Sequence, residues 1–240
     1  MSQETVRRRP VNSANLEARR KAIRRKKMKQ KRFLLLGMLL AVIIIIVLII
    51  VGIVSLIKGR FHDTTTLVID ADGTVTMDEV DDFSESNYDK SDMNSYIEDL
   101  VKEYNDSGKG GKVKLKKTKV KDDKAYVRMQ YSDYNAYQNF TNNELFVGTV
   151  GEAKAKGYNF EDTFSTVKDK SKGEAVSVED MTSDDNKKVV IVRGNENIIV
   201  PGKITAVSDP NTTIVDKDEI SVTQPDGNMD ATTLTIIMYE

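Results

Sequence analysis

Residues 33–57 have the sequence FLLLGMLLAVIIIIVLIIVGIVSLI, a run of 25 residues without a charged side chain. An α-helix rises about 1.5 Å per residue, so a helix of this length would span about 37 Å. The hydrocarbon core of a bilayer is about 30 Å thick, and such a helix crosses it with some tilt. The segment from Phe33 to Ile57 is therefore predicted to be a single transmembrane helix that binds the lipid bilayer.

The charges beside this segment predict its orientation. Thirteen Lys and Arg residues precede it with only Glu4 and Glu17, whereas only Lys58 and Arg60 lie between it and Asp63. Cations that flank a span stay on the cytoplasmic side. We therefore expect a basic, partly disordered N-terminal tail in the cytoplasm and an extracytoplasmic C-terminal domain, in a cell membrane protein that crosses once.

A cleaved signal peptide is the alternative interpretation of the apolar run. Such peptides have an apolar region of about 7 to 15 residues and end at a small-residue cleavage site. The run here is longer, and Val54-Ser55-Leu56-Ile57 offers no such site. A lipoprotein signal would need a cysteine to carry the lipid, and the chain has none. These observations favour an uncleaved transmembrane segment.

Charge separates the chain into two parts that its net charge of −1 conceals. The tail carries 13 cations and 2 acids, a net charge of +11, and residues 58–240 carry the other 23 cations and 35 acids, a net charge of −12. An acidic domain is repelled by nucleic acid, so no nucleic-acid partner is expected. The absence of cysteine outside a membrane fits a bacterial surface that does not rely on disulfides.

Residues 64–77 are predicted to form a β-hairpin around the turn Asp70-Ala71-Asp72-Gly73, because β-branched residues flank turn-forming ones. A weak calcium site is the alternative, since Asp70, Asp72 and Glu79 fall at positions 3, 5 and 12 of an EF-hand loop. Position 1 would then be Val68, whose side chain cannot bind calcium. The hairpin turn explains the same residues, so the metal prediction is none, with these three as the weak calcium candidate.

An amphipathic helix is predicted over residues 92–105, with Ser91 or Asp92 as its cap, because its apolar residues recur at helical spacing. Residues 112–121 and 125–131 follow as strands of a half-exposed sheet. The six lysines of the first strand are interpreted as a solvated face, at an edge protected by charge, rather than an anion site. Aromatic residues from Tyr134 to Phe164 are interpreted as core rather than as a glycan-stacking surface.

Short helices are predicted after Ser132 and Thr149, and the chain from residue 163 on is predicted to be mainly β. The fold class is therefore α+β, with a single N-terminal transmembrane helix followed by an extracytoplasmic domain rich in antiparallel strands with two or three short helices. The predicted division is a tail (1–32), the span (33–57), a connector (58–63) and the domain (64–240), with two subdomains, 64–160 and 161–240, as an alternative. Eight strands are expected in the last part: 163–167, 174–178, 188–193, 197–200, 203–207, 212–215, 219–223 and 232–239.

The sequence offers no motif for catalysis or for a cofactor. No cysteine is present, and the one histidine, His62, is interpreted as an interfacial residue rather than a ligand or base. No Gly-x-Ser-x-Gly or phosphate-binding loop occurs. Asp and Glu residues are so abundant that any pair of them is unspecific as a glycosidase site. No catalytic residue and no cofactor are predicted.

Three segments carry a resemblance: LFVGTVGEAKAKGY from Leu145, IVPGKI from Ile199 and TIVDK from Thr213. With them, residues 64–240 resemble a group of uncharacterised membrane-attached surface proteins of anaerobic Gram-positive bacteria. Members of that group are often lipoproteins, and this chain differs in using a transmembrane segment. The resemblance implies a location and a fold, but it implies no catalytic residue and no mechanism.

The expected function is that of a membrane-anchored binding or scaffolding protein of the bacterial cell envelope, with an envelope protein or glycan as partner and no enzymatic activity. Three alternatives stay open at this point. They are an enzyme that acts on cell-wall glycans through Asp and Glu, a component of a division or sporulation complex, and a sensor that passes an external signal to the tail.

Overall fold

The computed structural model describes residues 59–83, 89–161, 163–208, 211–223 and 233–240. The predicted tail and transmembrane segment lie outside these residues. Within the described ranges, no helix is both long enough and apolar enough to span a bilayer. The chain from Phe61 to Glu240 forms one compact unit, and the fold described below is that of this unit.

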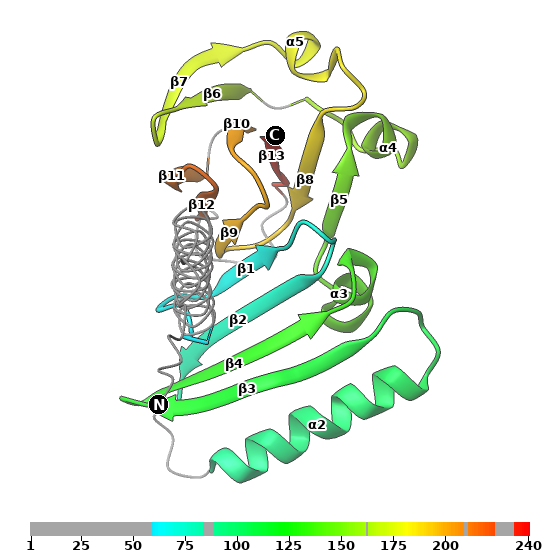
Figure 1. Ribbon diagram of the computed structural model, residues 1–240, viewed down its shortest axis with the longest axis vertical. Helices are drawn as coiled ribbons and strands as arrows, with labels where there is room; N and C mark the ends of the chain where they lie inside the picture. Colours follow the sequence, from blue (N-terminus) through cyan, green and yellow to red (C-terminus); the bar gives the residue numbers. More distant parts are fainter. Residues whose placement is uncertain (1–58, 84–88, 162, 209–210, 224–232) are drawn as a thin grey trace, which may run out of the picture. The chain divides into compact units, whose positions relative to one another are not determined.

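Two β-sheets make up this unit, with four helices in its described part, so the α+β class is confirmed (Figure 1). Sheet A has the strand order β11-β12-β9-β1-β2-β4-β3. Its only parallel pair is β1 with β9, and its other neighbours run antiparallel. The strands of sheet A are β1 (Thr66–Ile69), β2 (Val75–Asp82), β3 (Val113–Lys121), β4 (Lys124–Tyr131), β9 (Asn197–Ile199), β11 (Thr212–Asp216) and β12 (Glu219–Val222).

Sheet B is antiparallel throughout and has the order β5-β8-β13-β10-β6-β7. The last strand of the chain, β13, therefore lies in the middle of the sheet, between β8 and β10. The strands of sheet B are β5 (Leu145–Thr149), β6 (Phe164–Lys168), β7 (Ser171–Val176), β8 (Lys188–Val192), β10 (Ile204–Ser208) and β13 (Thr235–Tyr239).

Sequence explains why the two sheets are buried differently. Strand β8 buries four consecutive residues, 189–192, which alternate between two hydrophobic clusters, so sheet B is covered on both faces. Strand β4 instead alternates: Met129 and Tyr131 point into the core, whereas Tyr126 and Arg128 point away from it. We call the core-facing side of β1, β2, β4 and β3 the inner face and the opposite side the outer face.

Each helix begins at a side chain that accepts a hydrogen bond from its first turn. The N-cap residues are Asp89, Asp133, Thr149 and Ser177. The sequence predicted Ser91 or Asp92 for the first of these helices and Ser132 for the second, and both predictions are wrong by one to three residues. The Thr149 cap is confirmed, and the helix after Ser177 was not expected. The helices are α2 (Lys90–Asp106), α3 (Tyr134–Thr141), α4 (Val150–Ala155) and α5 (Val178–Thr182).

Helix α2 packs against β3, the edge strand of sheet A (Figure 1). Tyr104 is buried and Ile97 and Val101 pack on the core, as the apolar spacing predicts. Tyr96 and Leu100 are apolar residues at the same helical spacing, yet they are 66% and 38% exposed. The row of apolar residues is wider than the surface that β3 offers, because β3 is the edge strand of sheet A in the described part of the chain.

Both halves of the domain contribute to both sheets. Strand β1 of the first half pairs with β9 of the second half in sheet A, and β5 pairs with β8 in sheet B. One hydrophobic cluster also contains residues of both halves, such as Leu67 and Ile198. Residues 64–160 and 161–240 are therefore interleaved in one unit rather than folded as two.

Candidate functional site

The connector before β1 lies against the outer face of sheet A through His62. The backbone N–H of His62 donates to Asp78 Oδ2 over 3.0 Å, and its ring atom Nδ1 lies 2.7 Å from the same oxygen. Asp78 is on β2 and is fully buried. The only histidine of the chain therefore contacts a buried carboxylate, a partner that its position in the sequence did not indicate.

Arg128 completes a cluster of three around this carboxylate. Strand register places Arg128 of β4 directly opposite Asp78 of β2. Its Nε donates to Oδ1 over 2.5 Å and its Nη2 donates to Oδ2 over 2.6 Å, a two-pronged pair. A buried carboxylate is tolerated when its lone pairs are met by such donors. We call His62, Asp78 and Arg128 the connector clasp.

Opposing effects set the ionisation of the clasp. Burial alone would raise the pKa of Asp78, but the hydrogen bonds from Arg128 and His62 and the charge of Arg128 outweigh it and hold that pKa well below its usual range. The hydrogen bond to Asp78 in turn raises the pKa of the Arg128 guanidinium. The clasp therefore contains a carboxylate–guanidinium ion pair at every pH at which the protein would work.

Phe61 supplies a second contact between the connector and the sheet. Its ring lies 5.5 Å from the Tyr126 ring, centroid to centroid. Lys117 Nζ and the Arg128 guanidinium lie 5.1 Å and 5.2 Å from the centroid of Phe61, and Lys119 Nζ lies 5.2 Å from that of Tyr126. Cations over aromatic faces are attracted by the ring quadrupole. The connector is thus held by an ion cluster and an aromatic–cation cluster side by side.

The weak calcium candidates are placed in two different parts of the β1–β2 hairpin. Asp70 and Asp72 lie in its turn, where Gly73 N–H donates to Asp70 O and Thr74 N–H donates to Asp72 Oδ1. Glu79 lies well along β2, opposite Val127 of β4. In the described part of the chain, no three His, Asp or Glu side chains gather where they could hold a metal ion. The structure brings Asp70 and Asp72 together but not Glu79.

Glu196 is a buried carboxyl that the sequence did not single out. It precedes β9 in the segment that crosses from sheet B to sheet A, and it is 5% exposed. Asn195 N–H donates to its Oε2 over 2.6 Å, and the carboxyl folds so closely over Gly194 that a side chain there would collide with it. Burial raises the pKa of Glu196 to about 7, although the Asn195 hydrogen bond opposes this.

A glycosidase pair would need two carboxyl groups facing one cleft. Three open grooves, of about 350, 500 and 600 Å³, are each lined by a single acidic side chain: Glu240, Glu144 and Glu98 respectively. Glu144 is in addition bound to Arg193, whose Nη2 lies 2.9 Å from its Oε2. None of these three grooves presents the pair that the glycan-enzyme alternative requires.

The aromatic residues of the middle of the chain are confirmed as core. Phe146 and Phe164 are buried in one hydrophobic cluster and Tyr137 in the other. Tyr137 packs edge-on against Tyr131, with ring centroids 5.1 Å apart. Burial and, second, the nearby Glu196 carboxyl raise the pKa of the Tyr137 phenol. The rings fill space between elements, as apolar packing predicts.

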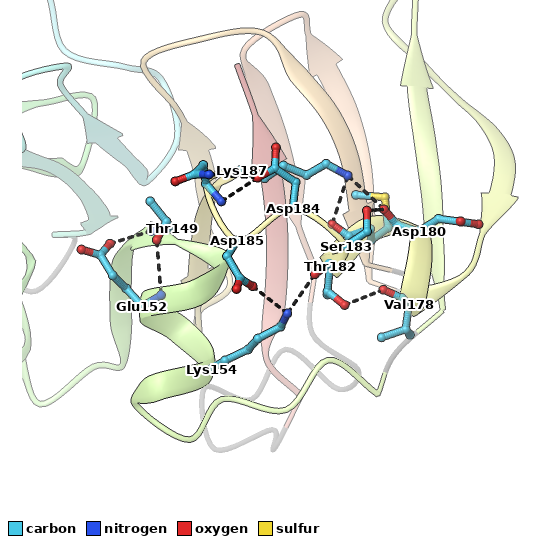
Figure 2. Close-up of polar contacts among 12 residues, drawn as sticks. Thr149, Glu152, Lys154, Val178, Asp180, Thr182, Ser183, Asp184, Asp185 and Lys187 are labelled. Carbon is cyan, nitrogen blue, oxygen red and sulfur yellow. Dashed lines mark hydrogen bonds and ion pairs between the residues drawn. The ribbon is translucent and has the colours of Figure 1, made fainter.

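A further polar cluster joins α4, α5 and the start of β8 (Figure 2). Lys154 of α4 donates to Thr182 O over 2.8 Å and to Asp185 Oδ1 over 2.9 Å. Lys187 donates to the backbone oxygens of Asp180 and Met181. Two ammonium groups thus satisfy carbonyls at the C-terminal end of α5, which favours positive charge. This cluster stabilises a helix end and presents no arrangement for chemistry.

Comparison with known protein families, with curated proteins and with solved structures finds no match for this chain. The resemblance to membrane-attached bacterial surface proteins therefore stays a prediction. The connector clasp and its aromatic neighbours are the polar and aromatic contacts that fix Phe61 and His62 on sheet A.

Proposed function

We propose that the chain is a single-pass membrane protein of the bacterial cell envelope, with a cytoplasmic tail and an extracytoplasmic domain that binds or scaffolds other envelope components. The apolar composition of residues 33–57 supports the span, and the cations before it support the orientation. A binding or scaffolding role is favoured over chemistry because the described residues hold polar clusters that serve the fold.

One observation carries this proposal: the fold begins at the connector. Phe61 and His62 contact sheet A, and only residues 58–60 separate Phe61 from the end of the predicted span. An extended chain covers at most about 3.6 Å per residue, so the path from Ile57 to Phe61 is at most about 14 Å. A docked connector of this length suits a domain that works close to its own membrane.

The absence of cysteine makes the topology directly testable. Single cysteines are introduced in the full chain as Ser13→Cys in the tail and Glu174→Cys on an exposed position of β7. In intact cells, a membrane-impermeant maleimide is expected to label Glu174→Cys and not Ser13→Cys. After permeabilisation it is expected to label both. Labelling of the tail in intact cells, or protection of the domain, contradicts the proposed orientation.

The span is tested separately by Ile45→Lys with Ile49→Lys. Each lysine at the centre of a span opposes insertion by about 2.5–3.5 kcal/mol. The double variant is expected to leave the membrane fraction on alkaline extraction, whereas Ile45→Leu with Ile49→Leu stays. A wild-type chain extracted by alkali alone would contradict the span.

The binding or scaffolding role is tested by crosslinking the full chain in intact membranes and identifying what co-purifies. Recovery of the same envelope protein or glycan with the wild type, and its loss in a chain with the domain removed, is the expected result. Recovery of no component that depends on the domain would contradict a scaffolding role.

A further inference from the structure

The outer face of β3 and β4 gathers cations in a domain that is otherwise acidic. Strand register places Lys114 opposite Gln130, Lys117 opposite Arg128, Lys119 opposite Tyr126 and Lys121 opposite Lys124. On the neighbouring β2, the acidic residues that share this face are Asp82 and Asp78, and Asp78 is already bound in the clasp. Of the lysines, Lys121 forms an ion pair with Asp122 over 3.1 Å. We call this surface the basic face; its cations are Lys114, Lys117, Lys119, Lys121, Lys124 and Arg128.

A bulge in β3 creates this arrangement. The register of β3 against β4 shifts between Leu115 and Lys117. The extra residue, Lys116, lets Leu115 on one side of the bulge and Val120 on the other both lie on the inner face, opposite Met129 and Ala125, although one number is odd and the other even. The lysines at 114, 117, 119 and 121 consequently all lie on the outer face.

The connector joins this face at its aromatic part. Phe61 lies beside Tyr126, and Lys117 and Lys119 lie over the two rings. Phe61 and Tyr126 are half-buried, and the five lysines of the face are exposed. Aromatic rings and lysine side chains together are typical of surfaces at the level of lipid head groups, where the rings lie in the interface and the ammonium groups meet phosphates.

We infer that the basic face binds the anionic phospholipid head groups of the membrane that holds the span, so that the domain rests on that membrane in one orientation. This inference depends on the proposed topology, since it needs the span to precede the connector. The short connector keeps the face near the bilayer, and a tethered contact forms at high effective concentration. The net negative charge of the domain repels its other surfaces from the same head groups.

The edge of β3 is a poorer candidate for pairing with a partner strand. The Asn105 side chain of α2 already bonds the backbone of this edge: its Nδ2 donates to Val113 O, and Val113 N–H donates to its Oδ1. The bulge and the lysines are further features that oppose strand addition. Charge complementarity to an anionic surface is therefore favoured over an added strand.

Vesicle co-sedimentation tests the inference with residues 59–240, which contain both sheets and both hydrophobic clusters. Vesicles of phosphatidylcholine with 30% phosphatidylglycerol are compared with pure phosphatidylcholine, at low and high salt. The wild type is expected to bind the anionic vesicles at least tenfold more tightly, and the difference is expected to shrink as salt is added. Equal binding to both vesicles overturns the inference.

Two variants with the same change in charge locate the surface. Lys114→Gln with Lys117→Gln and Lys119→Gln is expected to lose about tenfold in affinity for anionic vesicles. Lys168→Gln with Lys188→Gln and Lys203→Gln, at exposed positions associated with sheet B, is expected to stay within twofold of the wild type. Circular dichroism and thermal unfolding confirm that both fold. Equal losses in the two variants overturn the inference, as does binding to dextran sulfate without binding to vesicles.

The full chain in lipid nanodiscs provides a readout of orientation. An environment-sensitive dye on Gln130→Cys, on the outer face, is expected to shift to the blue when phosphatidylglycerol is included, and a dye on Lys203→Cys is not. Equal shifts at the two positions overturn the proposed orientation. Cysteine labelling distinguishes the two proposals. If Glu174→Cys alone is labelled in intact cells but the domain does not bind anionic vesicles, the lipid contact is refuted and the topology stands. If Ser13→Cys is labelled instead, the topology is refuted.

Discussion

His62 Nδ1 lies 2.7 Å from Oδ2 of Asp78, so a residue of the connector contacts a carboxylate that is fully buried in sheet A. The same oxygen also accepts the His62 backbone N–H and one Arg128 N–H. Phe61 and His62, which follow the predicted span by four and five residues, are thereby part of the folded domain, and we expect the stability of the domain to depend on them.

His62→Ala is expected to destabilise residues 59–240 by about 1–2 kcal/mol, because one donor to a buried carboxylate is removed while the backbone N–H and Arg128 remain. The free energy of unfolding in urea is the measurement, and faster tryptic cleavage after Arg60 is the accompanying sign that the connector has opened. Asp63→Ala, at an exposed neighbouring position, is the matched control. Equal losses in the two variants would contradict a specific role of His62.

Arg128→Met is expected to destabilise the domain by about 3–5 kcal/mol at pH 7, because it leaves the buried Asp78 charge with half its donors. The double variant Asp78→Asn with Arg128→Met removes the charge as well and is expected to recover much of this loss. A double variant less stable than Arg128→Met would show that the ion pair is not the reason for the loss.

The low pKa of Asp78 predicts an acid dependence with a definite sign. The ionised Asp78 side chain stabilises the folded state above about pH 4, which is the pKa of an aspartate in the unfolded chain. This stabilisation is lost progressively as the pH falls from there toward the lower pKa of the folded protein. The loss of stability caused by Arg128→Met is therefore expected to be larger at pH 7 than at pH 3. Denaturant midpoints measured at both values check this, and an equal loss would contradict the assigned ion pair.

Glu196 predicts the opposite dependence in a different window. Its pKa is about 7 in the folded protein and ordinary when unfolded, so between about pH 4.5 and 7 only the folded form keeps the proton, and stability falls as pH rises. At about 1.4 kcal/mol per pKa unit, the fall is about 3 kcal/mol. Glu196→Gln is expected to remove this dependence of the free energy of unfolding on pH and to stabilise the domain at pH 8. Glu174→Gln, at an exposed position, is expected to leave the dependence unchanged. A slope that persists in Glu196→Gln would contradict the assignment.

Lys154→Met is expected to loosen α5 and to lower the free energy of unfolding of the whole domain by about 1 kcal/mol or less, because the ion pair between Lys154 and Asp185 lies at exposed side chains. Hydrogen exchange of the α5 amides is the sensitive measurement, since the bond to Thr182 O closes the end of that helix. Lys203→Met serves as the control. Unchanged exchange in α5 would contradict this role.

Local patterns predicted the elements well and their long-range partners poorly. The hairpin around Asp70–Gly73 and the Thr149 helix follow from turn and cap chemistry within a few residues, and both are confirmed. The parallel pairing of β1 with β9 joins residues 131 positions apart, such as Thr66 and Asn197, and no local signal specifies it. Helix α5 is a single short turn of chain whose composition does not distinguish it from a loop.

The connector clasp and Glu196 show why most of the candidate site could not be predicted from the sequence. His62 has no suitable partner nearby in sequence, because Asp78 reaches it only through the β1–β2 hairpin and Arg128 only through the next strand pairing. The predicted hairpin covers residues 64–77 and excludes Asp78, whereas β2 continues to Asp82, so the sequence did not place this acid on a strand. The lysines of β3 were correctly placed at a sheet edge, but simple alternation could not show the bulge that puts them on one face.

The central position of β13 has a consequence for biosynthesis. Its strand partners, β8 and β10, are made long before it, yet sheet B has a gap between them until residues 235–239 arrive. The core of sheet B therefore cannot be completed until residues 235–239 have been synthesised and have left the ribosome. A product truncated before residue 235 lacks this central strand and leaves β8 and β10 without the neighbour that joins them.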